Sequence, residues 1–99
     1  MTSALLVAQA SESRTVLSRE LCNAGYSVTI VATSREAGTL LKIGFPDLLI
    51  WWVGRPSVDD LRLARAVKDR EMTAPLPVIY VHGPSDVQRI VDKLMGLRG

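Results

Sequence analysis

Few side chains of this sequence have the chemistry of a catalytic or metal site, and those that do stand far apart along the chain. His82 is the single histidine and Cys22 the single cysteine. A histidine serves as a metal ligand or a general base beside further ligands or a carboxylate, and neither Cys22 nor a nearby carboxylate offers suitable spacing. We therefore interpret His82 as a surface or hydrogen-bonded loop residue, with a pH-responsive role as the alternative.

The acidic residues favour helix formation over catalysis. Asp59 and Asp60 follow Ser57, and a helix N-cap together with the positive end of the helix dipole accounts for both carboxylates. The sequence contains no phosphate-binding GxxxxGK motif, no GxGxxG motif and no cysteine and histidine set with metal spacing. We therefore expect neither an enzyme nor a cofactor.

A basic helix face is the feature that would best suit nucleic acid. Its members recur at helical spacing: Arg62, Arg65 and Lys68. Asp69 and Glu71 interrupt the positive charge, and no aromatic residue for base stacking interleaves with it. A solvated helix face is therefore the favoured interpretation. The net charge of +2 is only mildly basic and adds little to the nucleic-acid hypothesis.

The segment PDLLIWWVGRP, residues 46–56, places the two tryptophans of the chain where a buried strand runs out into a loop. Binding sites of α/β proteins lie at such strand ends. Trp51 and Trp52 face opposite sides of a strand, so one can belong to the core while the other reaches the rim. Two hypotheses stand for Trp52. Either it packs into the core, or it anchors a protein partner, a role for which tryptophan is favoured.

Short aliphatic runs alternate with amphipathic stretches, which predicts strands alternating with helices. The predicted strands cover residues 4–8, 27–31, 48–53 and 77–81. A run at 12–24 and capping patterns at Thr33, Ser57 and Ser85 predict the helices, of which Gly25 and Gly44 end the first two. The predicted core sides of the helices are, in order, Val16, Leu17, Leu21 and Ala24; Ala37, Leu40 and Leu41; Leu61, Ala64 and Val67; and Val87, Ile90, Val91, Leu94 and Met95.

Length and composition place these elements in one domain. The chain has 99 residues, of which 47% are hydrophobic and 5% aromatic, so a single aliphatic core is expected. Its apolar runs are far shorter than the roughly 20 residues of a membrane-spanning helix. The start, MTSALLVAQAS, lacks the features of a signal peptide. We expect a cytoplasmic protein without a membrane partner.

In their order and spacing, the segments ALLVA, LCNAGYSVTIVATS, FPDLLI and PLPVIYVHG resemble the receiver domain of bacterial response regulators. The resemblance runs from Ala4 to about Val91 and includes Pro56. It implies an α/β, flavodoxin/CheY-like three-layer sandwich, with a parallel sheet of four strands in the order 2-1-3-4 and helices on both faces. The family has five βα units and this chain four, so residues 1–99 form a single receiver-like domain that is either a natural short form or a piece of a longer protein.

The resemblance also implies where phosphoryl-transfer chemistry would lie, and the required side chains are missing there. Family members hold Mg²⁺ with an acidic pair after the first strand and phosphorylate an aspartate that ends the third, while a hydroxyl after the fourth strand and a lysine after the fifth respond. Here Ala8 and Gln9 stand at the acidic pair, Trp52 at the acceptor and His82 at the hydroxyl position. We therefore expect neither Mg²⁺ nor a phosphoryl donor as a partner.

The missing fifth unit leaves two features of this architecture uncovered. The fourth strand becomes an edge that can pair with another chain. The first helix lacks a neighbour, and either the last helix or a partner protein takes that place. The apolar stripe of the last helix is core in the simpler interpretation, and part of it joins a dimer contact in the other. The expected interaction surface comprises Trp52, Tyr80, Val87, Ile90, Val91, Leu94 and Met95.

The sequence therefore predicts a phosphorylation-independent pseudo-receiver. It would be a protein–protein interaction module in bacterial signalling, with another protein or a second copy of itself, a homodimer, as its partner. Two alternatives stay open. One is a nucleic-acid-associated regulator that uses the basic helix face, which the interrupting acidic residues disfavour. The other is a small-ligand sensor whose pocket is bounded by Gln9, Trp52 and His82.

Overall fold

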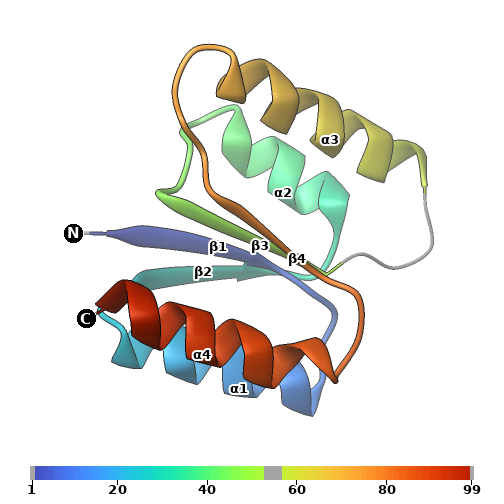
Figure 1. The fold of residues 1–99 in the computed structure, drawn as a ribbon. Helices are drawn as coiled ribbons and strands as arrows, with labels where there is room; N and C mark the ends of the chain where they lie inside the picture. Colours follow the sequence, from blue (N-terminus) through green and yellow to red (C-terminus); the bar gives the residue numbers. More distant parts are fainter. Residues whose placement is uncertain (1, 53–56, 99) are drawn as a thin grey trace.

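The computed structural model describes residues 2–52 and 57–98, with side chains up to residue 93, and in them four strands alternate with four helices (Figure 1). The strands are β1 (Ser3–Val7), β2 (Ser27–Val31), β3 (Leu48–Trp52) and β4 (Val78–Val81). The helices are α1 (Glu12–Asn23), α2 (Ser34–Leu41), α3 (Val58–Glu71) and α4 (Asp86–Arg98). The predicted bounds of β2 are confirmed, β1 begins one residue earlier than predicted, and β4 begins one residue later. The prediction for Val53 lies outside the described residues.

The four strands form one parallel sheet in the order β2-β1-β3-β4, which confirms the predicted order. In its register, Ala4 of β1 stands opposite Val28 of β2 on one side and Leu48 of β3 on the other. β1 and β3 are the inner strands and are covered on both faces, which explains why their sequences are continuously apolar. Because all strands run the same way, the loops after them gather at one end of the sheet.

Two hydrophobic clusters lie on the two faces of the sheet, each beneath one pair of helices (Figure 1). α1 and α4 lie side by side over the first cluster, to which they contribute Leu21 and Ile90. α2 and α3 lie side by side over the second, which includes Leu41, Leu63 and Trp51. The last helix, and not a partner protein, therefore takes the place beside α1. This arrangement is the predicted three-layer α/β fold.

Local hydrogen bonds begin α2 and α3 where the capping patterns predict. The Glu36 backbone N–H donates to Thr33 Oγ1 (3.2 Å) at the start of α2. At the start of α3, Ser57 and Asp60 form a complete capping box, in which each side chain accepts from the backbone N–H of the other. These bonds satisfy helix N–H groups that have no partner within the helix.

The start of α4 differs from its prediction. Gln88 does not reach back to Ser85; its side-chain amide donates to the carboxylate of Asp92, one turn further on (3.0 Å). The carboxylate of Asp86 instead accepts the backbone N–H of His82 (2.9 Å). The carboxylate that holds the chain at this helix start therefore comes from the first residue of the helix.

The predicted core side of α3 is largely wrong. Leu61 is 69% exposed and Ala64 is also exposed, whereas Leu63 and Val67 are buried. Leu61 and Leu63 are both apolar, and local spacing alone does not decide which of two adjacent stripes faces the sheet. The packing of α3 against α2 selects the stripe that contains Leu63, and of the predicted set only Val67 belongs to it.

The other helices bury most of the predicted positions. Gly25 ends α1 with a φ of 96°, the left-handed conformation that favours glycine. α2 ends at Leu41, earlier than the predicted stop at Gly44. The buried predicted side chains are Leu17, Leu21, Ala37, Leu41, Ile90 and Val91, and the half-buried ones are Val16, Ala24, Leu40 and Val87. The side chains of Leu94 and Met95 lie outside the described ones. Across residues 2–52 and 57–98, none of the helices has both the length and the apolar character for crossing a membrane.

Candidate functional site

The candidate site is a cavity of about 630 Å³ at the carboxyl ends of the inner strands and β2. The segment 8–11 after β1 and the segment 32–35 after β2 line it, together with Trp52 and the beginning of α3. Ala8, Gln9 and Trp52 thus lie together around one cavity, as members of the predicted pocket. His82 is not among its lining residues. It follows β4, beyond Trp52, and so lies to one side of the cavity.

The two tryptophans have different surroundings. Trp51 is 5% exposed, and its ring lies 5.8 Å from that of Tyr80, with the planes tilted by 38°. Trp52 is half-buried; it packs against the cluster beneath α1 and α4 and also lines the cavity. The side chains therefore serve opposite faces of the sheet, as expected for neighbours on a strand. Trp51 is core, and Trp52 is both a packing residue and a wall of the cavity.

The carboxylate of Asp60 is engaged by two neighbouring elements. The backbone N–H and the hydroxyl of Ser57 both donate to Asp60 Oδ2, each at 3.0 Å. The hydroxyl of Ser34, at the start of α2, donates to Asp60 Oδ1. Both oxygens thus have partners, and the carboxylate links the starts of α2 and α3. Helix capping explains the sequence position of Asp60, while the link to Ser34 has no local signal because the two residues are far apart in the chain.

Asp59 also lines the cavity, and one of its carboxylate oxygens lies 4.0 Å from the guanidinium of Arg62. α3 begins close enough to the strand ends to bring both Asp59 and Asp60 to the cavity wall. Among residues 2–52 and 57–98, no group of three histidine, cysteine, aspartate or glutamate side chains could hold a metal ion. After β1 the cavity is lined by Ala8 and Gln9, neither of which has a carboxylate.

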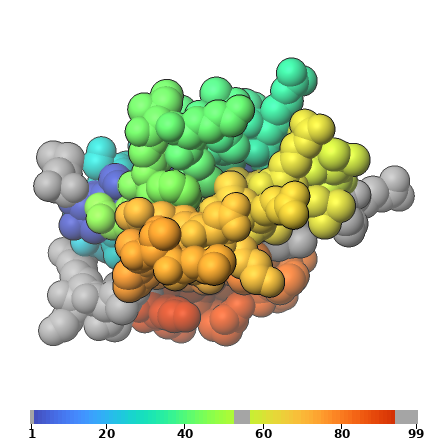
Figure 2. Space-filling model, turned by 90° about the horizontal axis from the view of Figure 1, so that it is seen from above, coloured from blue at the N-terminus to red at the C-terminus, as the bar shows by residue number. Residues whose placement is uncertain are grey.

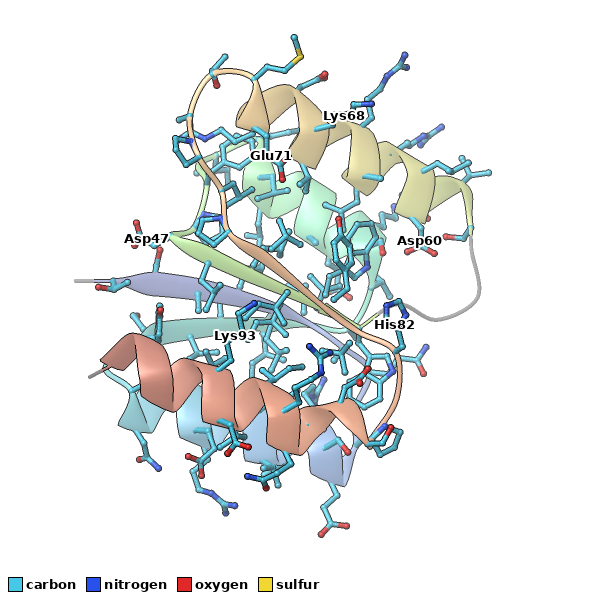
Figure 3. The ribbon with its side chains drawn as sticks, viewed as in Figure 1. Asp47, Asp60, Lys68, Glu71, His82 and Lys93 are labelled. Atoms are coloured by element: carbon cyan, nitrogen blue, oxygen red, sulfur yellow. The ribbon has the colours of Figure 1, made fainter. Side chains whose placement is uncertain are left out.

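His82 and Asp60 lie at the same end of the sheet, opposite the end that carries Asp47 (Figure 3). The His82 side chain is exposed, and its backbone N–H donates to the carboxylate of Asp86. That hydrogen bond is the main reason why the pKa of Asp86 falls below its ordinary value of 3.8; burial opposes the shift, and Arg89, at 3.5 Å, adds to it. The hydrogen bond comes from the backbone of His82 and orders the start of α4, while the charge of the nearby His82 side chain makes a smaller contribution to the lowered pKa.

Comparison with known proteins adds a regulatory relative. No family model matches the sequence. The chain is 31% identical over 83 residues to the DNA-binding transcriptional regulator NtrC of Klebsiella pneumoniae, and the match covers 84% of this chain and 18% of that protein. With the parallel sheet in the order 2-1-3-4, this similarity is consistent with a receiver-like domain. The chain spans less than a fifth of that regulator.

A solved structure has a similar fold. It is a fusion protein that contains amino acids 181–211 of the yeast Spc42 trimeric coiled coil. It matches with a TM-score of 0.63 and 20% sequence identity over 94% of this chain and 61% of that chain. At this identity the likeness concerns the fold alone.

The residues expected to form an interaction surface separate into two groups in this receiver-like fold. Tyr80 is 44% exposed on β4, and Trp52 and Val87 are half-buried. Ile90 and Val91 are buried against α1 and the sheet, so they serve the core of the chain itself and not its exposed surface. Leu94 and Met95 belong to the part of α4 whose side chains are not described.

The basic helix face lies on the solvent side of α3. Arg62, Arg65 and Lys68 are exposed, and Figure 3 shows Lys68 on the outer side of the helix. Arg70 has a different place: its guanidinium lies 4.9 Å from the centre of the Phe45 ring, a cation–π arrangement. Arg62, Arg65 and Lys68 therefore share the exposed side of α3, whereas Arg70 packs on Phe45.

Proposed function

We propose that this chain is a cytoplasmic receiver-like module that binds a protein in bacterial signalling or regulation without being phosphorylated. The observation that carries the proposal is the composition of the cavity at the strand ends. Trp52 stands where β3 ends, and Ala8 and Gln9 follow β1. An aromatic side chain at the end of β3 and the absence of a carboxylate at Ala8 and Gln9 support this proposal, because phosphoryl transfer in receivers needs a carboxylate nucleophile and metal ligands at those strand ends.

The two carboxylates at the cavity do not substitute for that nucleophile. Asp60 accepts hydrogen bonds at both oxygens from Ser57 and Ser34, and such bonds lower the nucleophilicity of a carboxylate. Asp59 lies beside the cation of Arg62. Both residues come from the start of α3 and have a structural explanation in helix capping and dipole interactions. The proposal therefore includes no enzymatic activity and no cofactor.

The edge of the sheet at β4 supports binding as the activity. β4 pairs with β3 on one side, and within the described residues no strand pairs with its other side. Its four residues, Val78–Val81, carry neither a charge nor a proline, which are the devices that protect an edge from pairing. Figure 2 shows the segment around β4, in orange, at the surface between α4, in red, and the region of α2 and α3, in green and yellow. A second copy or an extended segment of another protein can add a strand there.

Incubation with acetyl phosphate and Mg²⁺ tests the absence of phosphorylation. We expect the intact mass of the protein to stay unchanged, while a receiver domain with a complete acidic site gains a phosphoryl group under the same conditions. The Asp60→Asn variant serves as an internal control for any label found. A stable acyl phosphate on the wild-type chain would refute the proposal.

Sedimentation over a range of concentrations tests self-association through the β4 edge. We expect the wild type to dimerise and Tyr80→Lys to remain a monomer, because an edge lysine opposes strand pairing. Trp52→Asp tests whether the cavity wall takes part in the same contact. Arg19→Glu, an exposed change on α1, is the control for charge and should not alter the mass. A monomer at every concentration would remove the homodimer and leave another protein as the partner.

A small-ligand sensor is the second candidate, because the cavity has the volume of a ligand site and both Gln9 and Trp52 line it. The Trp51→Phe variant leaves Trp52 as the single tryptophan, whose emission can be excited selectively at a wavelength beyond the absorption of the tyrosines. Its emission should then shift on titration with polar metabolites if the cavity binds one. A flat response across the metabolites tested would count against a sensor.

A further inference from the structure

A second cavity, of about 650 Å³, lies in the groove between α2 and α3. It adjoins the cavity at the strand ends, with which it shares Ser34, Arg35 and Asp59, and its floor is apolar. Leu41 and Leu63 are buried beneath it, Gly38 and Ala66 form its half-buried centre, and Phe45 closes one end. A side chain that entered this groove would therefore meet aliphatic and aromatic surface.

The groove has an unfilled space at Gly38, a position where a larger residue would place a side chain. Gly38 stands inside α2 and faces the groove, and a Cβ atom added there would meet nothing within 4 Å. Two helices that packed without a gap would place a side chain at this position. The space above Gly38 is thus available to a group from another molecule.

The rim of the groove is mainly positive. Arg35 on α2, Lys42 at the C-cap of α2 and Arg62 on α3 are exposed at its borders. The carboxylate of Asp59 lies 4.0 Å from Arg62 and offsets that charge in part. Arg35 and Lys42 are about two turns of helix apart on α2, so two positive groups flank the apolar centre.

We infer that this groove binds an acidic, amphipathic peptide segment of a partner protein. The inference rests on the proposed protein-binding function and names the surface and the chemistry of the partner. One apolar side chain of the peptide lies over Gly38 and Ala66, where it is removed from water. Carboxylates on either side of it approach Arg35 and Lys42, which steers the encounter and sets the orientation.

The same features favour a peptide over nucleic acid. A nucleic-acid surface presents a row of cations along the phosphates and aromatic platforms for the bases. Here the floor beneath Gly38 and Ala66 is aliphatic, Phe45 at one end is the single aromatic side chain among the lining residues, and the carboxylate of Asp59 next to Arg62 would repel a phosphate. An apolar side chain flanked by carboxylates matches both the floor and the rim.

The test uses the full chain and a fluorescein-labelled synthetic peptide of about seven residues, with one central leucine and glutamates on either side, a length of about two helical turns. We expect saturable binding by fluorescence anisotropy and NMR shift changes centred on Gly38 and Ala66. A peptide of the same charge with alanine in place of leucine should bind more weakly, because it lacks the group for the apolar floor.

Two variants and their matched controls locate the binding. Gly38→Leu fills the floor and should weaken binding about tenfold, which corresponds to the loss of one buried apolar contact. Lys42→Glu should weaken it severalfold, an effect that decreases at high salt. The controls are Asn23→Leu and Arg19→Glu, exposed changes on α1, which should bind as the wild type does. Thermal melts of each variant establish that it is folded.

Three results would overturn the inference: no binding of the leucine peptide to the wild type, binding that Gly38→Leu and Lys42→Glu leave unchanged, or duplex DNA that binds with the same dependence on these variants. The outcome is independent of the acetyl phosphate and sedimentation experiments. If the peptide fails and the protein stays unphosphorylated, the groove is refuted while the proposed function stands. If the protein is phosphorylated and the peptide binds, the proposed function is refuted while the groove is confirmed as a peptide-binding surface.

Discussion

The two helix layers on this sheet differ in how completely they close. In the α1 and α4 layer, Leu17, Leu21 and Ile90 are fully buried, and the described side chains of these two helices include no large exposed apolar group. In α3 and the connections of the α2 and α3 layer, such groups are exposed: Ile43, Phe45, Val58, Leu61 and Met72. Tyr80 of β4 is exposed beside Trp51 on this face, whereas Ile30 of β2, opposite Leu6, is exposed on the other face. Among the described residues, the α1 and α4 layer is therefore the more closed of the two, and the α2 and α3 layer the more open.

This difference follows from where α4 lies. α4 crosses to the face of α1 and completes that layer (Figure 1). The opposite face of β4 then has no helix of its own, and Tyr80 stays partly exposed over Trp51. Exposed apolar surface that is gathered in one region marks interaction sites in soluble proteins. The comparison therefore assigns stability mainly to the α1 and α4 layer and supports the proposal that the α2 and α3 layer is the one that binds.

The largest predicted effect tests the closed layer against the open one. Leu17→Ala should lower the free energy of unfolding by about 4 kcal/mol, and Leu63→Ala by about 3 kcal/mol. The second cost is smaller because the helices that border the groove can close over the cavity that the substitution creates. Urea unfolding of both variants measures the difference. Equal costs, or a larger cost for Leu63→Ala, would contradict the comparison.

Substitutions that remove the N-terminal caps of α3 and α1 should have the next largest effect on the free energy of unfolding. Asp60→Ala removes a capping box and the link to Ser34, and should cost about 1.5 kcal/mol. Ser11→Ala removes the single side-chain cap of α1, which accepts the N–H of Arg14 at 3.1 Å, and should cost about 1 kcal/mol. Asp69→Ala, an exposed change on α3, is the control and should stay within about 0.5 kcal/mol of the wild type. Thermal unfolding gives the order, and a larger cost for Ser11→Ala would show that the Ser34 link is not stabilising.

A gain of stability is expected at the groove. Gly38→Ala removes backbone freedom from the unfolded chain and adds a Cβ atom in open space, so it should stabilise the protein by about 0.5–1 kcal/mol. Gly25→Ala should instead destabilise it, because Gly25 has a φ of 96°. Unfolding midpoints in urea measure both changes. A loss of stability in Gly38→Ala would mean that the groove is filled in solution.

The smallest effect concerns pH and the start of α4. The pKa of Asp86 is lowered in the folded protein by the hydrogen bond from the His82 backbone. A lowered pKa means that the ionised carboxylate stabilises the fold above the ordinary value of 3.8, and that this contribution is lost as the pH falls through the lower folded value. The wild type should therefore be more stable than Asp86→Asn at neutral pH, and the difference should vanish in acid. A difference that persists at the lowest pH would exclude the carboxylate as its cause.

Most of the fold could be predicted, but less of the site. The strand bounds and their order followed from apolar runs and from the resemblance to receivers. Trp52 and Gln9 were placed correctly at the strand ends, since all parallel strands deliver their loops to one end of the sheet. His82 was grouped with them although it lies to one side of the cavity, because β4 is the outermost strand. The link between Ser34 and Asp60 was missed, as it joins two helix starts that only packing brings together.

The sequence by itself determined the features that depend on residues close together in the chain, such as where helices begin and end. A serine or threonine and an acidic residue three positions later make a capping box, so the starts at Thr33 and Ser57 were readable, and a glycine that can adopt a positive φ ends α1. Only the tertiary structure decided that Leu63 and not Leu61 faces the core, and that α4 covers α1. Those choices depend on contacts between distant segments, whose burial outweighs any local preference. They also decide which helix layer is left open.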